Sequence, residues 1–225
     1  MTMSYDETIK WLQKEAIEFL KSHYLVVNGV EIYPKEIEVY RYEKEGEFKD
    51  VYVHCSKKQA NRHYKFYVHE KGRGGCDLVI SNSKNLYYSY LIRSVVIDGE
   101  LIVGPLNSFD AICAKTGVPE KELDTAKVTV KDYNNDHNVF TDTRIGLKHK
   151  EDDKGQIYLN AELRFILCDE CYKPQEDKKK RYKNRERALT NFMLQKLASH
   201  EMTKDEVIKE ADEYLGYVPK SLKEC

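Results

Sequence analysis

A run of short segments rich in Val, Ile, Tyr and Phe between residues 37 and 104 constrains the fold most. The segments are IEVYRY, DVYVHC, HYKFYVHE, CDLVISN, YYSYLIRSVVI and ELIVG. β-Branched and aromatic residues are typical of strands, and Gly or Asn in the intervening stretches is typical of turns. Asn28-Gly29, just upstream, also predicts a turn between two strands. The pattern therefore predicts a curved, mainly antiparallel β-sheet.

Helices are expected on both sides of this run. Ser4 opens a capping box, and apolar residues then recur at helical intervals, so residues 5–22 are expected to form a helix. NSFDAICAKTG predicts a short helix that is capped by Asn107 or Ser108 and ended by Gly117.

Two late strands and a helical extension complete the predicted organisation. TRIGL and AELRFILC, at 143–147 and 161–168, are expected strands. The sequence then becomes basic in KKKRYKNRER, residues 178–187, and helical in ALTNFMLQKLASHEM and KDEVIKEADEYLGYV. We predict an α+β fold: a single curved sheet domain with surrounding helices at 1–171, and a basic, helical C-terminal extension at 172–225.

Charge balance and cysteine usage limit the classes of partner. The chain has 38 acidic and 37 basic residues, so its net charge gives no long-range attraction for polyanions. The first residues are polar and acidic, unlike a signal peptide, and no apolar run approaches the ~18 residues of a membrane span. The six cysteines are scattered, which favours reduced thiols. We expect a cytoplasmic protein without a membrane partner; the sequence leaves its oligomeric state open.

Three short segments give little evidence of a phosphate-binding, metal-binding or nucleic-acid-binding site. KGRGG, residues 71–75, lacks the spacing of a phosphate-binding loop and predicts a tight turn. Cys168 and Cys171 form a lone CxxC, whereas a zinc site needs about four ligands, so the spacing favours an incidental pair and leaves metal binding open. We expect no metal and no cofactor. The basic run at 178–187 is either a solvated face or a segment that contacts phosphates.

One carboxylate interrupts the apolar pattern of the first long strand. In IEVYRYE, residues 37–43, alternate side chains point to opposite faces, so Glu38 and Tyr40 share one face. Ile37 and Val39 share the other, which is the expected core face. Glu38 is therefore either on the solvated side of a strand or on the floor of a site.

The same region carries an ordered series of short motifs. They are EVY at 38–40, YVH at 52–54, FYVH at 66–69, GCD at 75–77, LIR at 91–93, GP at 104–105, RIGLKH at 144–149 and LRF at 163–165. The series, with AIEFLKSHY upstream, resembles the alkyladenine (3-methyladenine) DNA glycosylase family over roughly residues 15–168. The resemblance implies that family's fold and the excision of modified purines, which are flipped out of the duplex before hydrolysis.

The resemblance also implies residue roles. Glu38 matches the Glu that activates water to attack the sugar carbon, and Arg93 matches the Arg near that water and the target phosphate. Tyr40 matches the aromatic residue that stacks on the flipped base, and His54 matches the His that touches the base. Each position keeps a purely structural alternative, such as a half-buried strand Tyr or a buried ion pair for Arg93.

The sequence departs from the family pattern at three places. His69 stands where the family has a second stacking Tyr, and Asp77 lies near the Asn that screens base edges. An ionised Asp accepts hydrogen bonds but donates none, so the base preference would change. The stretch EKGRGG, residues 70–75, offers only Lys71, Gly72 and Arg73 at the place where the family inserts a Tyr wedge into DNA.

These departures leave more than one function open. The first is a divergent N-glycosidic hydrolase that excises modified purines from DNA or from free nucleosides. The alternative is a non-catalytic module that binds nucleic acid, a nucleotide or a protein on the same scaffold. A third possibility is that the helices after residue 186 form a dimer or docking surface.

Overall fold

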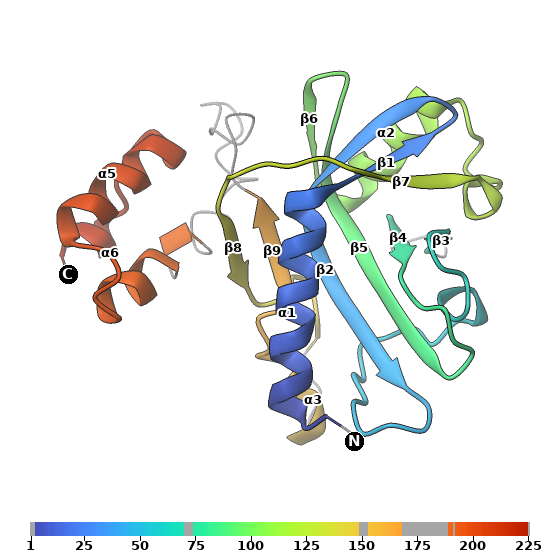
Figure 1. Cartoon of the computed structure of the whole chain (residues 1–225), viewed down its shortest axis with the longest axis horizontal. Helices are drawn as coiled ribbons and strands as arrows, with labels where there is room; N and C mark the ends of the chain where they lie inside the picture. The colour runs from blue at the N-terminus through green and yellow to red at the C-terminus, as the bar shows by residue number, and fades with distance from the viewer. Residues whose placement is uncertain (1–2, 70–73, 149–152, 168–188, 191, 225) are drawn as a thin grey trace.

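The chain folds as an α+β protein around one curled antiparallel sheet (Figure 1). The computed structural model describes residues 3–69, 74–148, 153–167, 189–190 and 192–224. Within them, nine strands form the sheet in the order β3-β4-β5-β2-β1-β7, with β6 paired to β5 and with β9 and then β8 joined to β2. The predicted mainly antiparallel sheet with surrounding helices is thus confirmed.

The element bounds fix where each motif lies. The strands are β1 (His23–Val27), β2 (Val30–Glu43), β3 (Phe66–Val68), β4 (Cys76–Val79), β5 (Leu86–Ile97), β6 (Glu100–Val103), β7 (Val128–Asp132), β8 (Val139–Asp142) and β9 (Arg164–Leu167). The helices are α1 (Tyr5–Ser22), α2 (Pro105–Thr116), α3 (Asp153–Leu159), α5 (Lys204–Leu215) and α6 (Lys220–Lys223), with short 3₁₀ turns η1 (Lys57–Gln59) and η2 (Leu123–Thr125).

Helix α1 covers one face of the sheet (Figure 1). The Ser4 hydroxyl accepts the backbone N–H of Glu7 at 3.3 Å and the Ser4 N–H donates to the Glu7 carboxylate at 2.8 Å, so the predicted capping box is confirmed. Ile37 and Val39 of β2, both 0% exposed, belong to the core beneath this helix. The residues that alternate with them therefore project to the opposite face of the sheet. The helix buries an apolar stripe: Leu12, Ala16, Phe19 and Leu20.

Strands β2 and β5 form the centre of the sheet, and their register is interrupted. Glu36 pairs with Ser94, whereas the next residue, Ile37, pairs with Ile92. Arg93 is therefore the extra residue of the β5 ladder. A β-bulge bends its strand and re-aims a side chain, and such bulges are frequent beside functional sites.

The C-terminal helices cover β8 and β9 on the face opposite α1. Phe140 and Ile166, at 1% and 0% exposure, pack with the apolar residues of these helices, whereas Phe165 and Leu167 belong to the core under α1. Thr203 caps α5, and Gly216, with φ of 72°, ends it. The predicted late helix is thus confirmed. The boundary at 171/172 and the basic run at 178–187 lie outside the described residues.

Two segments predicted as strands are irregular. In DVYVHC, residues 50–55, the Asp50 carboxylate accepts the backbone N–H of Tyr52 at 3.0 Å, a local bond that competes with a strand. In TRIGL, residues 143–147, the backbone N–H of Ile145 donates to a carboxylate on β2 instead of to a neighbouring strand. Conversely, β7 and β8 were not predicted.

The predicted cap of α2 was also wrong. The helix begins at Pro105 with Gly104, at φ of 99°, as its N-cap, so neither Asn107 nor Ser108 caps it. Proline favours the first position of a helix, because its fixed φ suits the helix and its missing N–H is not needed there. The predicted stop at Gly117 is confirmed, with φ of 68°.

Candidate functional site

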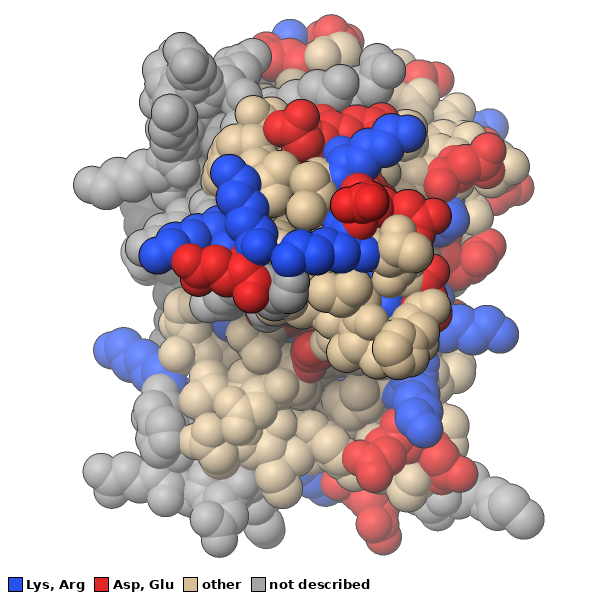
Figure 2. Space-filling view, turned by 90° about the vertical axis from the view of Figure 1, so that its left-hand side faces the viewer, with Lys and Arg blue, Asp and Glu red and all other residues tan. Residues whose placement is uncertain are grey.

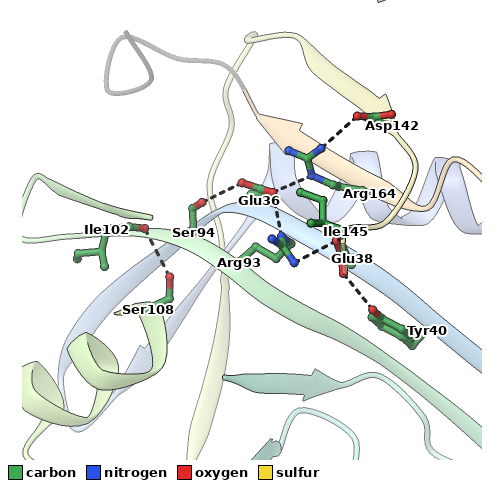
Figure 3. A network of polar contacts seen from close by, with 10 residues as sticks. All are labelled: Glu36, Glu38, Tyr40, Arg93, Ser94, Ile102, Ser108, Asp142, Ile145 and Arg164. Carbon is green, nitrogen blue, oxygen red and sulfur yellow. Dashed lines mark hydrogen bonds and ion pairs between the residues drawn. The ribbon is translucent and has the colours of Figure 1, made fainter. Parts of the chain in front are cut away.

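The carboxylate of Glu38 lies inside a buried polar network (Figure 3). Its Oε1 accepts the backbone N–H of Ile145 at 2.7 Å and lies 3.1 Å from Nη1 of Arg93. Its Oε2 accepts the hydroxyl of Tyr40 at 3.0 Å. Glu38 is 0% exposed, so these three donors replace its hydration. Three predicted site residues, Glu38, Arg93 and Tyr40, are thus in direct contact.

Arg93 joins two carboxylates. Besides contacting Glu38, it donates Nε–H to Oε1 of Glu36 at 3.0 Å (Figure 3). Its side chain is 14% exposed. Burial opposes its charge, but the neighbouring Glu38 and Glu36 outweigh burial and raise the pKa of Arg93. The guanidinium therefore remains a cation beside Glu38.

Glu36 extends the network to β9 and β8. Its Oε1 also accepts Nε–H of Arg164 at 2.8 Å, and its Oε2 accepts the hydroxyl of Ser94 at 3.1 Å. Nη1 of Arg164 reaches Asp142 at 3.2 Å (Figure 3). Side chains from four strands, β8, β9, β2 and β5, therefore fix the orientation of Arg93.

Tyr40 is held between Glu38 and a second arginine. The guanidinium carbon of Arg144 lies 4.6 Å from the ring centre of Tyr40, and Nη1 of Arg144 donates to Asp50 at 2.5 Å. Burial and the adjacent Glu38 raise the pKa of Tyr40 well above 10, so the phenol keeps its proton and continues to donate to Glu38. Because Arg144 covers one face of the ring, a stacked base would have to use the other face.

His69 and Asp77 form a second pair on this side of the sheet. Nε2 of His69 lies 2.6 Å from Oδ1 of Asp77. Oδ2 of Asp77 accepts the hydroxyl of Ser89 at 2.7 Å and Nε2–H of Gln59 at 3.2 Å. Both carboxylate oxygens are therefore engaged within the protein.

His54 stands at the exposed rim of this second group. It belongs to the irregular segment after Asp50 and is exposed, and its Nδ1 lies 3.2 Å from the hydroxyl of Tyr67. Its ring centre is 5.0 Å from that of His69, with the planes at 67°. Three aromatic rings, those of His54, Tyr67 and His69, thus gather beside Asp77.

The two groups share one row across the sheet. Directly opposite residues in antiparallel strands project to the same face. Asp77 pairs with Leu91, Leu91 pairs with Glu38, and Glu38 pairs with Arg164. Asp77 and Glu38 are therefore two strand spacings apart, about 10 Å between backbones. The complete row is Tyr67, Asp77, Leu91, Glu38, Arg164 and Asp142.

An open groove of about 440 Å³ lies elsewhere, between α1 and the segment 157–162. None of the six predicted site residues lines it. Glu38, Arg93 and Tyr40 lie on the face of the sheet opposite α1, so the groove belongs to a different part of the surface. In this conformation the carboxylate of Glu38 is closed off from solvent.

Sequence reasoning assigned no role to Glu36, Arg164, Arg144 or Asp50. LRF and RIGLKH were noted as motifs, but the arginines inside them were not paired with acids. Arg164 and Arg144 are 1% and 4% exposed. An arginine next to apolar strand residues is rarely buried without an acidic partner. The arginines in LRF and RIGLKH therefore carried a signal that buried acidic residues lie nearby.

The described side chains on one face of the molecule offer little to a polyanion (Figure 2). On the face that carries α5 and α6, basic and acidic side chains are intermingled (Figure 2). Helix α5 contains two lysines and five acidic residues. The basic run at 178–187, Lys71 and Arg73 at the wedge position, and the Cys168–Cys171 pair all lie outside the described residues.

The described residues form neither a cluster of metal ligands nor a membrane-spanning helix. Among them, no group of three or more His, Cys, Asp or Glu side chains is arranged to hold a metal ion. Nor does any helix in the described ranges combine the length and apolar character needed to cross a membrane.

No protein-family model and no curated protein sequence matches this chain. The glycosylase resemblance therefore stays a prediction. It is carried by the ordered sequence motifs.

Proposed function

We propose that this chain is a divergent N-glycosidic hydrolase of the alkyladenine-glycosylase type, acting on a modified purine in DNA or in a free nucleoside. The observation that carries the proposal is the 3.1 Å contact between Nη1 of Arg93 and Oε1 of Glu38, with Tyr40 on the other carboxylate oxygen. These residues come from the EVY and LIR motifs, whose order along the chain motivated the resemblance.

Glu38 acts as the general base of this reaction. It accepts a proton from the water that attacks the sugar carbon C1′, while the bond from C1′ to the purine nitrogen breaks and its electron pair leaves with the base. The sugar passes through an oxocarbenium-like state, which a nearby carboxylate also stabilises. The bonds from Ile145, Arg93 and Tyr40 hold the carboxylate in one orientation.

Arg93 acts beside the base as an electrostatic group. Glu36 fixes its Nε–H edge, so that Nη1 faces Glu38. A cation held there binds the phosphate next to the target sugar and orients the attacked carbon over Glu38. Its raised pKa keeps this charge at all pH values of physiological interest.

Substrate entry requires Tyr40 to move. Glu38 is 0% exposed, and the hydroxyl of Tyr40 occupies Oε2. Tyr40 itself is partly exposed at the surface of the sheet. When its side chain turns outward, Oε2 becomes available to the attacking water and the free ring face becomes available to the base.

A second candidate is a binding module without chemistry on the same scaffold. The observation in its favour is the complete burial of Glu38 together with its three donors, which is also what a structural ion pair requires. In that case the rings of His54 and His69 hold a ligand at the rim, and Glu38 only supports the sheet.

The deciding experiment is a base-release assay with matched variants. Duplexes containing a single hypoxanthine, ethenoadenine or 7-methylguanine, and the corresponding free nucleosides, are incubated with protein, and released base is measured. Glu38→Gln keeps the shape but removes the base; Glu45→Gln, an exposed carboxylate just after β2, is the control. We expect release that falls by about 10²–10⁴-fold in Glu38→Gln and is unchanged in Glu45→Gln.

The other outcomes separate the two candidates. If wild-type protein releases no base from any substrate, or if Glu38→Gln is as active as wild type, the proposal of a hydrolase that uses Glu38 is wrong. Binding of duplex that weakens steeply with salt, without base release, favours the binding module.

A further inference from the structure

The open groove of about 440 Å³ beside α1 has no part in the reaction proposed above. Two hydrogen bonds hold its walls together. The hydroxyl of Tyr5 donates to the carbonyl oxygen of Ile157 at 3.1 Å, and Nε2–H of Gln13 donates to the carbonyl oxygen of Glu162 at 3.2 Å. Tyr5, Ile9 and Gln13 are four residues apart in turn, so they follow one face of the helix. The two bonds therefore fix the two ends of the groove, with Ile9 between them.

The groove offers apolar surface to an occupant. Ile9 of α1 and Ala161 of the opposite wall both line it, and Ile157 beside them is 50% exposed. Figure 1 shows α3, which carries Ile157, at the N-terminal end of α1 and far from α5 and α6. Helices α5 and α6 therefore leave Ile157 uncovered.

Two charged side chains stand beside this apolar surface. Asp6 and Lys10 line the groove and are exposed, and neither forms an ion pair among the described residues. They lie about 6 Å apart along the helix axis. Glu162, the third charged residue of the lining, is engaged, since its Oε2 accepts the hydroxyl of Thr141 at 3.4 Å. A matching occupant therefore supplies an apolar side chain, a base opposite Asp6 and an acid opposite Lys10.

A second α1 that runs antiparallel to the first meets these requirements. Its charges then follow in the reverse order, so Asp6 of each copy faces Lys10 of the other. In a two-fold contact every such pair occurs twice, and Ile157 is likewise presented from both sides. The net charge of −1 gives two copies little mutual repulsion. The groove and its rim are thus complementary to themselves.

We propose that the groove is the interface of a two-fold homodimer, in which the α1 helices of two copies lie antiparallel and Ile157 of each copy enters the groove of the other. Apolar contacts at the centre supply the affinity, and the two Asp6–Lys10 pairs fix the direction of the helices. The interface uses no residue of the proposed hydrolytic site, so the two proposals stand or fall separately.

Sedimentation velocity of the full chain over a range of concentrations measures the association. We expect the mass to rise from that of one chain to that of two and to go no higher. Ile157→Asp places a charge in the apolar contact and should keep the protein monomeric. Glu15→Lys, at an exposed residue of α1 outside the groove, is the control and should associate as wild type does.

Exchanging the two charges tests the direction of the helices. Asp6→Lys and Lys10→Asp each bring like charges together at both ends of the contact, and each should weaken association by about tenfold or more. The double variant restores opposite charges and should associate as wild type does. Thermal melts report whether each variant folds, and Lys10→Asp carries the comparison if Asp6→Lys, which places a cation in the first turn of α1, does not.

The contrary results are equally specific. Wild-type protein that stays monomeric at the highest concentration reached, or a dimer that Ile157→Asp leaves intact, would overturn the proposal. Growth beyond two chains would also overturn it, because an open head-to-tail contact does not close at two. Single charge variants that associate as wild type does, or a double variant that does not recover, would overturn the antiparallel arrangement.

Discussion

Arg164 donates Nε–H to Glu36 across 2.8 Å, although 128 residues separate them in the chain. They are 1% and 4% exposed, respectively. The same oxygen of Glu36 also accepts from Arg93, so one buried carboxylate orients two arginines. Buried ion pairs cost desolvation energy and contribute little net stability, but they fix geometry when all their bonds are satisfied. Glu36 thereby connects β5, the strand that carries Arg93, with β9, which pairs with β2 and carries Arg164.

Arg164→Met should strongly destabilise the protein. The variant leaves Glu36 with one arginine fewer and removes from Asp142 the cation that now lies 3.2 Å away. Removing one partner from a buried ionic group costs about 3–5 kcal/mol. Urea unfolding measures the loss. Lys220→Met, at a side chain that is 85% exposed, is the control and should change stability by less than about 0.5 kcal/mol. A loss for Arg164→Met as small as in the control would contradict this account.

The sheet and its polar face were predictable from local sequence, because alternation on a strand is a local property. IEVYRY indicates that Ile37 and Val39 face the core, and the structure buries both completely. The pairing of Glu36 with Arg164 was not predictable, because it depends on a register shift and on strand order. Neither leaves a local pattern in the sequence.

The errors in the irregular segments have a related cause. Residues 50–55 and 143–147 contain β-branched residues and therefore look like strands. Their polar groups are instead used by tertiary contacts: Asp50 binds Arg144, and the N–H of Ile145 binds Glu38. Such contacts outweigh weak strand propensity, and they are visible only once distant segments have been brought together. Two loops that build the candidate site were therefore predicted as part of the sheet.

Arg93 and Glu38 should be energetically coupled in unfolding experiments. Arg93→Met leaves a buried carboxylate short of a partner, and Glu38→Gln removes that carboxylate's charge, so the double variant should lose less stability than the sum of the single variants. We expect a coupling energy of about 1–3 kcal/mol from urea unfolding of the four proteins. The control cycle is Lys115 and Asp98, a surface pair at 2.9 Å with side chains 40% and 64% exposed, for which ~0.2–1 kcal/mol is typical. Additive losses at Arg93 and Glu38 would show that the contact is incidental.

The protein should lose stability steeply above pH 10. Burial raises the pKa of Tyr90 well above 10, and the pKa of Tyr40 is raised by burial and by Glu38. In the unfolded chain these groups lose their protons near pH 10, whereas the native state retains them. The native state therefore binds more protons, and the free energy of unfolding falls as pH rises, by up to about 1.4 kcal/mol per pH unit for each tyrosine.

Single variants test this assignment. Urea unfolding between pH 8 and 11 should show a shallower decline for Tyr90→Phe and for Tyr40→Phe than for wild type. Tyr217→Phe, at a residue that is 42% exposed, is the control, and its stability should decline with pH as steeply as that of wild type. Wild-type slopes retained in both Tyr90→Phe and Tyr40→Phe would indicate that other groups cause the alkaline loss.

Removing residues 172–225 should leave a protein that folds but self-associates. Among the described residues, the core under α1 includes none from the C-terminal helices, so the sheet should still form. Phe140 and Ile166, now almost fully buried, would face water on the uncovered side of β8 and β9. Apolar surface exposed in this way binds hydrophobic dyes and promotes self-association.

Light scattering measures the self-association of the truncated protein, and dye fluorescence measures its exposed apolar surface. A point variant of the full-length chain shows whether these changes come from the uncovered apolar surface or from the shorter chain. Val207→Asp places a charge in the buried interface of α5 in the full-length chain and should reproduce the dye binding. Lys209→Asp, on the same helix but outside the apolar cluster, should not. A truncated protein that neither binds dye nor self-associates would show that the helices after residue 188 do not protect the outer face of β8 and β9.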